Sequence, residues 1–425
     1  MIKIYNYGQV SNEEIFARDN ISANVEGVVA QIIATVVSQG DKALYDYAAQ
    51  FDKVNLTSLE VSQQEIDEAF AAVEPEFLEI LREAAENIRA YHQKQVRNSF
   101  ILNEKDGVVI GQKVTAIEKV GLYVPGGTAA YPSTVLMNAI PARVAGVREI
   151  VMTSPARGGQ MNPDILAAAR IAGVDRVFRM GGAQAVAALA YGTESVPRAD
   201  KIVGPGNAYV AEAKRQIFGQ AGIDMIAGPS EILILADAAS DPARVAADLL
   251  SQAEHDTDAS ALLLTDSEEL AKAVAEAVEA QLSCLPREAI ARQSMERNGR
   301  IIVTETMAQA IELSNLWAPE HLELCVEEPF ALLLEIRHAG SVFLGRSTAE
   351  AIGDYWAGCN HTLPTGGTAR YASPLSVDDF VKKTQYIYYS PEAAAAAAED
   401  IALFARREGL EGHARSALKR KEGQA

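Results

Sequence analysis

The stretch from Glu149 to Met180, EIVMTSPARGGQMNPDILAAARIAGVDRVFRM, contains the pattern that decides the fold. Two short β-rich segments, EIVMTS and DRVFRM, flank residues 163–172, where apolar residues recur at helical spacing. Strands that alternate with helices in this way favour parallel sheets joined by crossover helices. The stretch therefore predicts an α/β fold.

The same alternation continues on both sides of this stretch. Helices are predicted over 133–146 and 183–191, residues 25–97 have helical periodicity, and the last 50 residues are predicted to be helical again. Further strands are predicted at KVGLYV, KIVG, EILILA, ALLLT, RIIVT and GSVFLG. Four glycine-rich turns, VPGGTAAYP, RMGGAQ, VGPGNAY and AGPSE, lie where predicted strands end. Ligands bind outside the carboxyl ends of the strands in open α/β sheets, so we expect a ligand site at that edge.

Composition limits the class of protein. The chain is 48% hydrophobic, which is enough for a large buried core. Its length of 425 residues predicts roughly two to four domains. A formal net charge of −19 argues against nucleic acid or an anionic membrane surface as a partner. Cys284, Cys325 and Cys359 are far apart and odd in number, which predicts reduced thiols in a cytoplasmic protein. We expect neither a signal peptide nor a membrane-spanning helix, because no apolar run is long enough.

The segment WAPEHLEL, Trp317 to Leu324, places Glu320 and His321 side by side after Pro319. Proline suits the first turn of a helix, so we expect a helix to begin here. A helix start favours an ionised Glu320 and a neutral His321, which together would supply two proton acceptors near neutral pH. An ordinary helix start with one surface glutamate and one packed histidine would give the same eight residues.

Two further segments combine residues that can bind a metal or a substrate. In DLLSQAEHD, Gln252 and His255 are three positions apart and share one face at the end of a helix predicted to start at Asp241. They could equally be the polar end of that helix. In GDYWAGCNHTLPT, Asp354 is a candidate metal ligand or substrate anchor and His361 a candidate substrate contact, whereas Cys359 fits a small buried residue.

A third segment, REGLEGHARS, contains Glu408, Glu411 and His413 and is broken by Gly409 and Gly412, which interrupt helical periodicity. The segment is either held by a ligand or an ordinary charged tail. The chain has no CxxC pair, no HExxH and no GxGxxG fingerprint. The residues alone therefore indicate an α/β enzyme with a candidate metal site and a candidate Glu–His base pair.

Taken together in order, nine segments resemble the histidinol dehydrogenase family, from about residue 115 to 416. The residues 25–97 fit that family in length and character. The matching segments are GLYVPGGTAAYPSTVLMNAIPA, GGAQAVAALAYGTESVP, GPGNAYVAEAKRQ, AGPSEILILAD, LLSQAEHD, APEHLEL, GSVFLG, GDYWAGCNHTLPT and EGLEGHARS.

The resemblance implies a cytoplasmic enzyme that contains one Zn²⁺ per subunit. The expected reaction is the oxidation of L-histidinol to L-histidine through L-histidinaldehyde with two NAD⁺, the last step of histidine biosynthesis. Three alternatives are the same machinery acting on another polyol or hydroxy acid, a zinc hydrolase, and a binding protein without catalysis. An intact Ser230, Glu408 and HARS ending favour histidinol over another alcohol, and the Glu320–His321 pair argues against binding alone.

The resemblance also implies roles for individual residues. His321 is expected to be the base that removes the substrate protons, and Glu320 to activate the water that adds to the aldehyde. The expected NAD contacts are Tyr123, Gln184 and Asn207. The expected zinc ligands are Gln252, His255, Asp354 and His413. Substrate contacts are expected from Ser230, Glu408, His321 and the four zinc ligands, with His361 as a further one.

The implied architecture is an intertwined homodimer in which each subunit has two Rossmann-like parallel-sheet domains with smaller helical N- and C-terminal extensions. The expected boundaries are an N-terminal extension over 1–20, a first domain from 21–115 and 230–370, and an NAD-binding second domain over 116–229. A helical extension over 371–425 would reach the partner subunit and donate Glu408 and His413. Gly412 stands where alanine is more usual in this family, which is expected to loosen the fourth zinc ligand without removing it.

Overall fold

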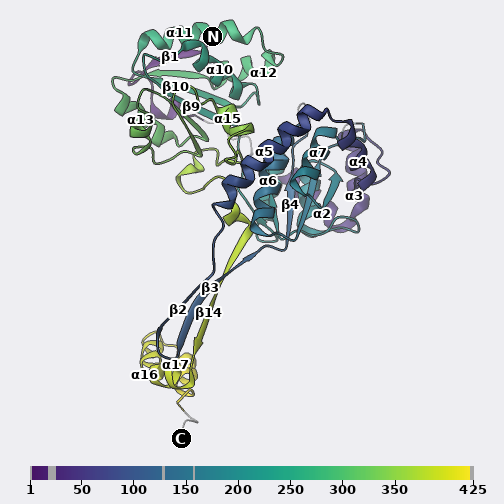
Figure 1. Cartoon of the computed structure of the whole chain (residues 1–425), viewed down its shortest axis with the longest axis vertical. Helices are drawn as coiled ribbons and strands as arrows, with labels where there is room; N and C mark the ends of the chain where they lie inside the picture. The colour runs from purple at the N-terminus through teal and green to yellow at the C-terminus, as the bar shows by residue number, and fades with distance from the viewer. Residues whose placement is uncertain (1, 18–24, 127–129, 157, 422–425) are drawn as a thin grey trace. The chain divides into compact units, whose positions relative to one another are not determined.

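The structure is a computed structural model, and it describes residues 2–17, 25–126, 130–156 and 158–421. The chain divides into two compact units (Figure 1). The first contains Met1–Gln95 and Ile117–Phe380, and the second contains Val96–Ala116 and Val381–Ala425. None of the helices among the described residues is both long and apolar enough to cross a membrane.

A six-stranded parallel sheet forms one half of the first unit, with the strand order β1-β11-β10-β9-β12-β13. Every residue of its central strands β9, β10 and β12 is buried, as expected for parallel strands covered on both faces. The strands are β1 (Lys3–Asn6), β9 (Glu231–Ala236), β10 (Ser260–Thr265), β11 (Arg300–Val303), β12 (His321–Cys325) and β13 (Ser341–Leu344).

Helices cover both faces of this sheet. On one face α10, α11 and α12 bury a core that includes Ile232 and Leu249. On the other face α1 and α13 bury a core that includes Leu233 and Trp317. The helices of this half are α1 (Asn12–Ile15), α10 (Pro242–Ala253), α11 (Glu268–Leu282), α12 (Glu288–Arg297), α13 (Met307–Trp317), α14 (Pro329–Leu333) and α15 (Glu350–Tyr355).

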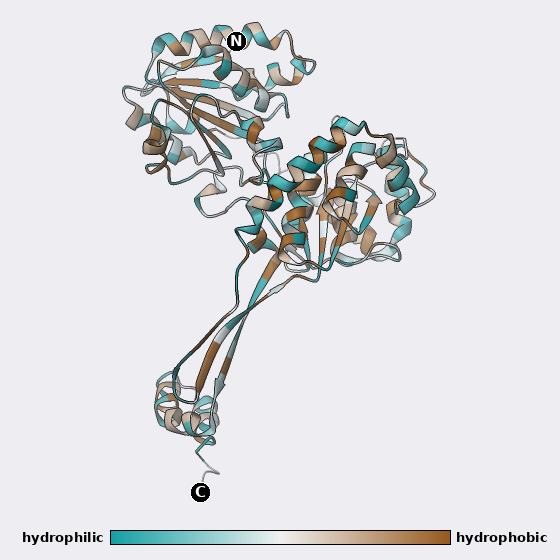
Figure 2. Ribbon diagram, in the orientation of Figure 1, coloured by the Kyte–Doolittle hydropathy of each residue, from teal (hydrophilic) through white to brown (hydrophobic). Residues whose placement is uncertain are grey.

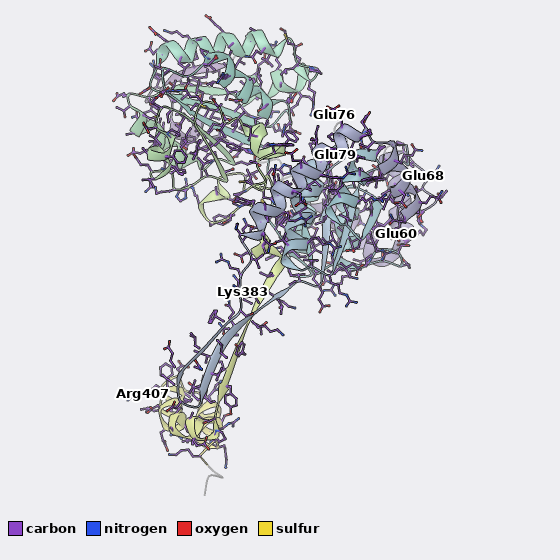
Figure 3. The ribbon with its side chains drawn as sticks, viewed as in Figure 1. Glu60, Glu68, Glu76, Glu79, Lys383 and Arg407 are labelled. Atoms are coloured by element: carbon purple, nitrogen blue, oxygen red, sulfur yellow. The ribbon has the colours of Figure 1, made fainter. Side chains whose placement is uncertain are left out.

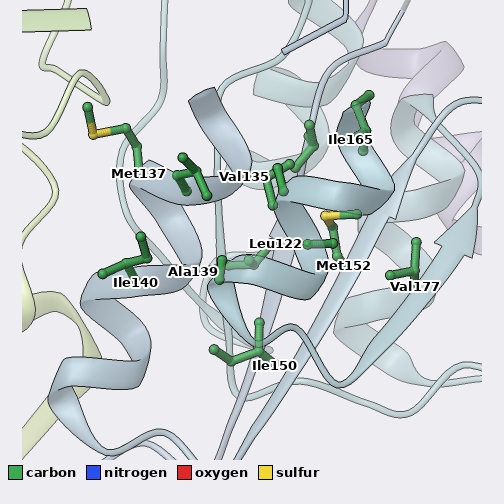
Figure 4. Close-up of a cluster of buried hydrophobic side chains, with 14 of the residues drawn as sticks. Leu122, Val135, Met137, Ala139, Ile140, Ile150, Met152, Ile165 and Val177 are labelled. Carbon is green, nitrogen blue, oxygen red and sulfur yellow. The ribbon is translucent and has the colours of Figure 1, made fainter. Parts of the chain in front are cut away.

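A five-stranded parallel sheet with the order β6-β5-β4-β7-β8 forms the other half. One face is covered by α4, α5, α6 and α7, whose core includes Leu122, Val135 and Ile150 (Figure 4). The other face is covered by α2, α3, α8 and α9. The strands are β4 (Lys119–Tyr123), β5 (Glu149–Ser154), β6 (Arg176–Arg179), β7 (Lys201–Val203) and β8 (Gly222–Ile223).

The helices of this half confirm the predicted alternation. They are α2 (Glu26–Gln39), α3 (Asp41–Tyr47), α4 (Gln63–Ala72), α5 (Pro75–Gln93), α6 (Pro132–Ala145), α7 (Pro163–Ala172), α8 (Gly182–Tyr191) and α9 (Ala208–Ile217). A π-helical turn, Ala48–Asp52, follows α3. Acidic side chains such as Glu68, Glu76 and Glu79 project from the surfaces of α4 and α5 (Figure 3).

The expected grouping of 21–115 with 230–370 is wrong. Helices α2 to α5 pack on the five-stranded sheet built from residues 119–223, and β1, from the expected N-terminal extension, joins the six-stranded sheet beside β11. Periodicity shows that a helix has an apolar face, but it does not show which sheet that face covers.

The second unit combines an antiparallel sheet, in the order β14-β3-β2, with two helices. The strands are β2 (Phe100–Lys105), β3 (Val108–Ala116) and β14 (Val381–Tyr389), and the helices are α16 (Pro391–Arg407) and α17 (Glu411–Leu418). The predicted helical extension over 371–425 contains α16 and α17 but also a strand that was not predicted, because VKKTQYIYY is a nine-residue segment rich in β-branched and aromatic residues. The predicted break is confirmed at Gly409, which has φ +78° between α16 and α17, but Gly412 lies within α17 and does not interrupt it.

Candidate active site

The segment around Glu320 and His321 is the end of one helix and the start of a strand. Helix α13 ends at Trp317, and Ala318 adopts a left-handed conformation with φ 54°. Pro319 follows, and His321 is the first residue of β12. The expected helix start at Pro319 is therefore wrong. Proline also commonly follows a helix C-terminus, which it cannot extend, and HLELC is a buried strand between β9 and β13.

This placement puts the Glu–His pair at the amino edge of the six-stranded sheet. His321 pairs with Ile232 and Ser341, near the beginnings of β9 and β13, and Ser230 immediately precedes β9. The crossover helix α10 runs back from the carboxyl edge, so its end brings Gln252 and His255 to the same amino edge.

The carboxyl edge that we expected to bind ligands belongs to the other sheet. The turns after β4, β6 and β7 lie at the carboxyl edge of the five-stranded sheet, although residues 127–129 of the first turn lie outside the described residues. AGPSE instead precedes β9 and lies at the amino edge of the six-stranded sheet.

Residues from both edges line one cavity. Gly204 and Asp224 come from the five-stranded half, and Ser230, Glu320 and His361 come from the six-stranded half and the segment after α15. This cavity is therefore lined by three of the predicted site residues and by residues of two predicted glycine-rich turns, VGPGNAY and AGPSE.

His321 lies in a buried cluster of carboxylates. Its Nδ1 lies 2.9 Å from the carbonyl oxygen of Glu231 and 3.7 Å from Glu320 Oε2. Its Nε2 lies 3.6 Å from Glu350 Oε1 and 3.7 Å from Asp354 Oδ1, and it has no hydrogen-bond partner among the described residues. The Glu320 carboxylate accepts a hydrogen bond of 2.8 Å from the Glu231 backbone N–H, which fixes it beside the imidazole.

The predicted metal ligands Gln252, His255 and Asp354 gather around this cluster. Gln252 is fully buried, and its amide lies 3.5 Å from His255 Nδ1. With its amide nitrogen turned toward Glu350, Gln252 donates at 2.8 Å and presents its oxygen to the side of His255. Ligand atoms of His321, Glu350 and Asp354 lie within 4.8 Å of one another. The His255 imidazole, the Gln252 amide oxygen and the Asp354 carboxylate fit a divalent cation, and these donor types suit zinc among several metals.

The pKa values reflect burial among like charges. Burial raises the pKa of Glu320 to about 8 and that of Glu350 to about 7. Burial alone would lower the pKa of His321, but Glu350, Glu320 and Asp354 outweigh it and raise that pKa well above its ordinary value. Burial lowers the pKa values of His255 and His361, which keeps these imidazoles neutral and able to accept a proton or bind a metal.

Sequence reasoning missed Glu350, which is buried beside His321. The signal was its spacing, because Glu350 and Asp354 are four apart on α15 and so share one helix face. A second missed carboxylate, Glu323, accepts from the Glu350 backbone N–H at 2.8 Å and so fixes the start of α15. His361 adjoins this helix, with Nδ1 3.2 Å from the Asp354 carbonyl oxygen.

The expected NAD contacts lie at the carboxyl edge of the five-stranded sheet. Tyr123 ends β4, and its buried hydroxyl accepts from the Gly182 N–H at 3.1 Å. Gln184 is buried in the first turn of α8. Asn207 caps α9, where its Oδ1 accepts from the backbone N–H groups of Tyr209 and Val210.

Glu408 and His413 belong to a different unit from the other predicted site residues. Glu408 is the C-cap residue of α16 and His413 lies in α17, so both belong to the second unit, and both are exposed. Cys359 is partly buried and free, and its thiol interacts with Tyr91.

Comparison with known proteins identifies the family. A model of the family described as histidinol dehydrogenase matches residues 17–421. The chain belongs to the histidinol dehydrogenase family. A histidinol dehydrogenase from Geobacter sulfurreducens is 54% identical over 406 residues, which cover 95% of each chain, and one from Geobacillus kaustophilus is 56% identical over 389 residues, covering 91% of this chain and 92% of the relative.

Structural comparison agrees with this family. The crystal structure of histidinol dehydrogenase from Elizabethkingia anophelis superposes with a TM-score of 0.94 at 39% identity, covering 99% of this chain and 98% of that one. Membership in the histidinol dehydrogenase family makes the chain an NAD-dependent oxidoreductase of histidine biosynthesis.

The raised pKa of Glu320 predicts a pH-dependent stability. Between its ordinary value of 4.5 and about 8, the folded metal-free chain holds a proton on Glu320 that the unfolded chain has released. The free energy of unfolding should therefore fall as the pH rises through this window. Glu320→Gln carries no such proton, so its free energy of unfolding should not fall in this way. Relative to the original chain, the variant should become more stable by up to about 1.4 kcal/mol for each pH unit in this window.

Urea unfolding with a chelator present, at about pH 5 and about pH 8, would measure this difference. Glu335→Gln, at an exposed position, is the matched control and should follow the original chain. Parallel stability curves for Glu320→Gln and the original chain would show that Glu320 is ionised in the folded state.

Proposed function

We propose that the chain oxidises L-histidinol to L-histidine through L-histidinaldehyde, using two NAD⁺ and one zinc ion per subunit. The observation that carries this proposal is the adjacency of Glu320 and His321 at a buried sheet edge, beside Ser230 and His361. A four-electron oxidation removes protons twice and adds one water between the two hydride losses. Two neighbouring groups that handle protons suit such a reaction, because both reach one carbon without moving the substrate.

In this proposal His321 is the base. Its Nδ1 is held by the Glu231 carbonyl oxygen, which leaves Nε2 to take the proton from the substrate hydroxyl and later from the hydrated aldehyde. A cation bound among the carboxylates would offset their charge and lower the pKa of His321, which favours the neutral, accepting form.

Glu320 in turn activates the water that adds to the aldehyde. The Glu231 N–H occupies Oε2 of Glu320, so Oε1 is the oxygen left to accept a proton from water. In the deprotonated state, burial makes this carboxylate a stronger base than one in water.

Gln252, His255 and Asp354 would hold the zinc, and His413 of the partner subunit would be the fourth ligand. Zinc, when bound, supplies Lewis acidity and orients a substrate that has imidazole and amine nitrogens. Ser230 and Glu408 would contact the substrate directly, with His361 beside Ser230.

NAD⁺ would bind at the five-stranded sheet, in residues 116–229, near Tyr123, Gln184 and Asn207. The chain passes from β4 to β5 and β6 on one side and returns to β7 and β8 on the other. Strand order therefore reverses between β4 and β7, and dinucleotides bind at the carboxyl ends of strands at such a switch point.

We also propose a cytoplasmic homodimer in which residues 371–425 reach the partner. The second unit exposes large apolar side chains, and its strands contain hydrophobic stretches, drawn in brown in Figure 2. Ile387 and Tyr388 are adjacent in β14, so they point to opposite faces, yet they are 72% and 57% exposed. Leu403 and Phe404 of α16 are 60% and 69% exposed. A monomer rarely leaves such surfaces uncovered, and a second copy would bury them.

Mixing two inactive variants tests the shared site. If His413 acts in the partner's site, a dimer of His321→Ala with His413→Ala contains one site with both histidines. Random mixing after joint refolding should then recover about a quarter of the original activity, because half the dimers are mixed and each has one intact site. No recovery, in dimers shown to be mixed, would place His413 in its own subunit's site.

Substrate choice tests the reaction itself. We expect kcat/KM for L-histidinol to exceed that for leucinol by at least about 10²-fold, because leucinol leaves the groups that bind the imidazole unpaired. The alternative is a different polyol or hydroxy acid with the same machinery. Initial rates of NADH formation over a panel of alcohols would distinguish them, and a preferred substrate without an imidazole would overturn histidinol.

A further inference from the structure

Lys214 and Asp224 form an ion pair buried in the five-stranded half, and the mechanism above does not use them. Lys214 lies in α9 and Asp224 follows β8, and their side chains are 2% and 1% exposed. Removing two charges from water costs several kcal/mol per ion, and an apolar pair of similar volume often stabilises a protein as well. Stability alone is therefore a weak reason to find these residues here.

Both members of the pair hold the same residue, Gly204. The Lys214 ammonium donates to the Gly204 carbonyl oxygen at 2.9 Å, and Asp224 Oδ2 accepts from the Gly204 N–H at 2.8 Å. The two side chains thus satisfy both backbone polar groups of one residue and pair with each other.

Gly204 needs this restraint because its position is unusual. Its φ of +115° lies in the region that favours glycine, and a Cβ there would lie 2.0 Å from the Tyr123 carbonyl oxygen. Gly204 follows β7 directly beside the end of β4, at the point where the strand order reverses.

Gly204 lies next to both of the proposed binding sites. Three residues later Asn207 caps α9, and it is a proposed NAD⁺ contact. Gly204 and Asp224 also line the cavity that contains Ser230 and Glu320. A shift of Gly204 would move the turn toward the dinucleotide and the wall of the histidinol cavity together.

We propose that Lys214 and Asp224 are positioning residues that fix Gly204, and through it the turn to Asn207, for binding of the dinucleotide. This inference rests on the proposed binding of NAD⁺ at the five-stranded sheet. Neither side chain touches the reacting atoms, so their effect should appear in the KM values, above all in that for NAD⁺, rather than in kcat.

Three variants separate positioning from stability. Lys214→Met and Asp224→Asn each leave a buried charge unpaired, so both should lower Tm and raise KM for NAD⁺ by about 10-fold or more, the scale of supporting-residue effects at bound groups. The double variant K214M/D224N leaves no unpaired charge, so Tm should recover toward that of the original chain. It still lacks the donor to the Gly204 carbonyl oxygen, so KM for NAD⁺ should stay raised.

Lys201→Met is the matched control. Lys201 lies in β7, three residues before Gly204, and bonds to Asp379 at 3.0 Å and to its carbonyl oxygen at 2.7 Å. Its replacement also removes a partly buried ion pair, but it should leave KM for NAD⁺ unchanged.

Recovery of KM together with Tm in the double variant would overturn the proposal, as would single variants that keep the original KM. Titration of each variant with NADH, followed by fluorescence, measures dinucleotide binding without histidinol. If the unsubstituted protein binds NADH but does not oxidise histidinol, the proposed reaction is wrong, and the NADH titration still tests the positioning role. A chain that does not bind NADH would overturn the positioning role itself.

Discussion

His321→Ala is expected to lower kcat for histidinol oxidation by about 10³-fold or more, while the metal stays bound. General base catalysis by a positioned side chain contributes about 10²–10⁴-fold per step, and this reaction uses the base in both oxidations. No neighbour can replace it at the same point, because the nearest carboxylate oxygens of Glu350 and Asp354 lie 3.6 and 3.7 Å from His321 Nε2.

Steady-state NADH formation and metal content per subunit, measured on the same preparation, would check this prediction. His338→Ala is the control, since His338 lies after α14 and outside the His321 cluster. It should keep the original kcat. Full activity in His321→Ala would rule out the base assignment, whereas loss of metal together with activity would indicate a ligand role.

Glu320→Gln is expected to slow the oxidation of histidinaldehyde by about 10²–10³-fold and the oxidation of histidinol much less. Only the aldehyde step adds water, and glutamine keeps the acceptor for the Glu231 N–H while it cannot take a proton. In the original chain the aldehyde step should speed up as pH rises through the pKa of Glu320, which burial raises above its ordinary value and a bound cation would lower again. The variant should lack that rise.

Rates measured separately from histidinol and from histidinaldehyde, over a range of pH, would show this selectivity. Glu335→Gln, at an exposed position, should behave as the original chain. Equal slowing of both steps would assign Glu320 a role in binding or structure, and an unaffected aldehyde step would remove it from water activation.

Much of the fold could be predicted because local signals agreed. Asn162 caps α7 through its side chain, Pro163 occupies the first turn and Gly173 ends the helix in a left-handed conformation, so the predicted bounds 163–172 match. The Gln252–His255 contact also followed from local spacing, although the helix ends earlier than predicted. Gln252 lies in the last turn of α10, and His255 lies in the turn that follows it, 3.5 Å from the Gln252 amide.

The predictions that failed depend on contacts distant in sequence. Pro319 suits both a helix start and the residues after a helix, and only the pairing of β12 with β9 and β13 decides between them. Glu350 becomes a site residue because α15 returns to the amino edge of the sheet beside His321. Which sheet the α2–α5 helices cover is likewise decided by packing between distant segments.

The central claim is a metal-dependent four-electron oxidation of histidinol at the Glu320–His321 pair. Counting NADH formed per L-histidinol consumed, before and after treatment with a chelator, tests it most directly. We expect two NADH per histidinol, loss of this activity on chelation and its return with zinc. One NADH per histidinol with histidinaldehyde as the product, or a rate that chelation leaves unchanged in metal-free protein, would contradict the account.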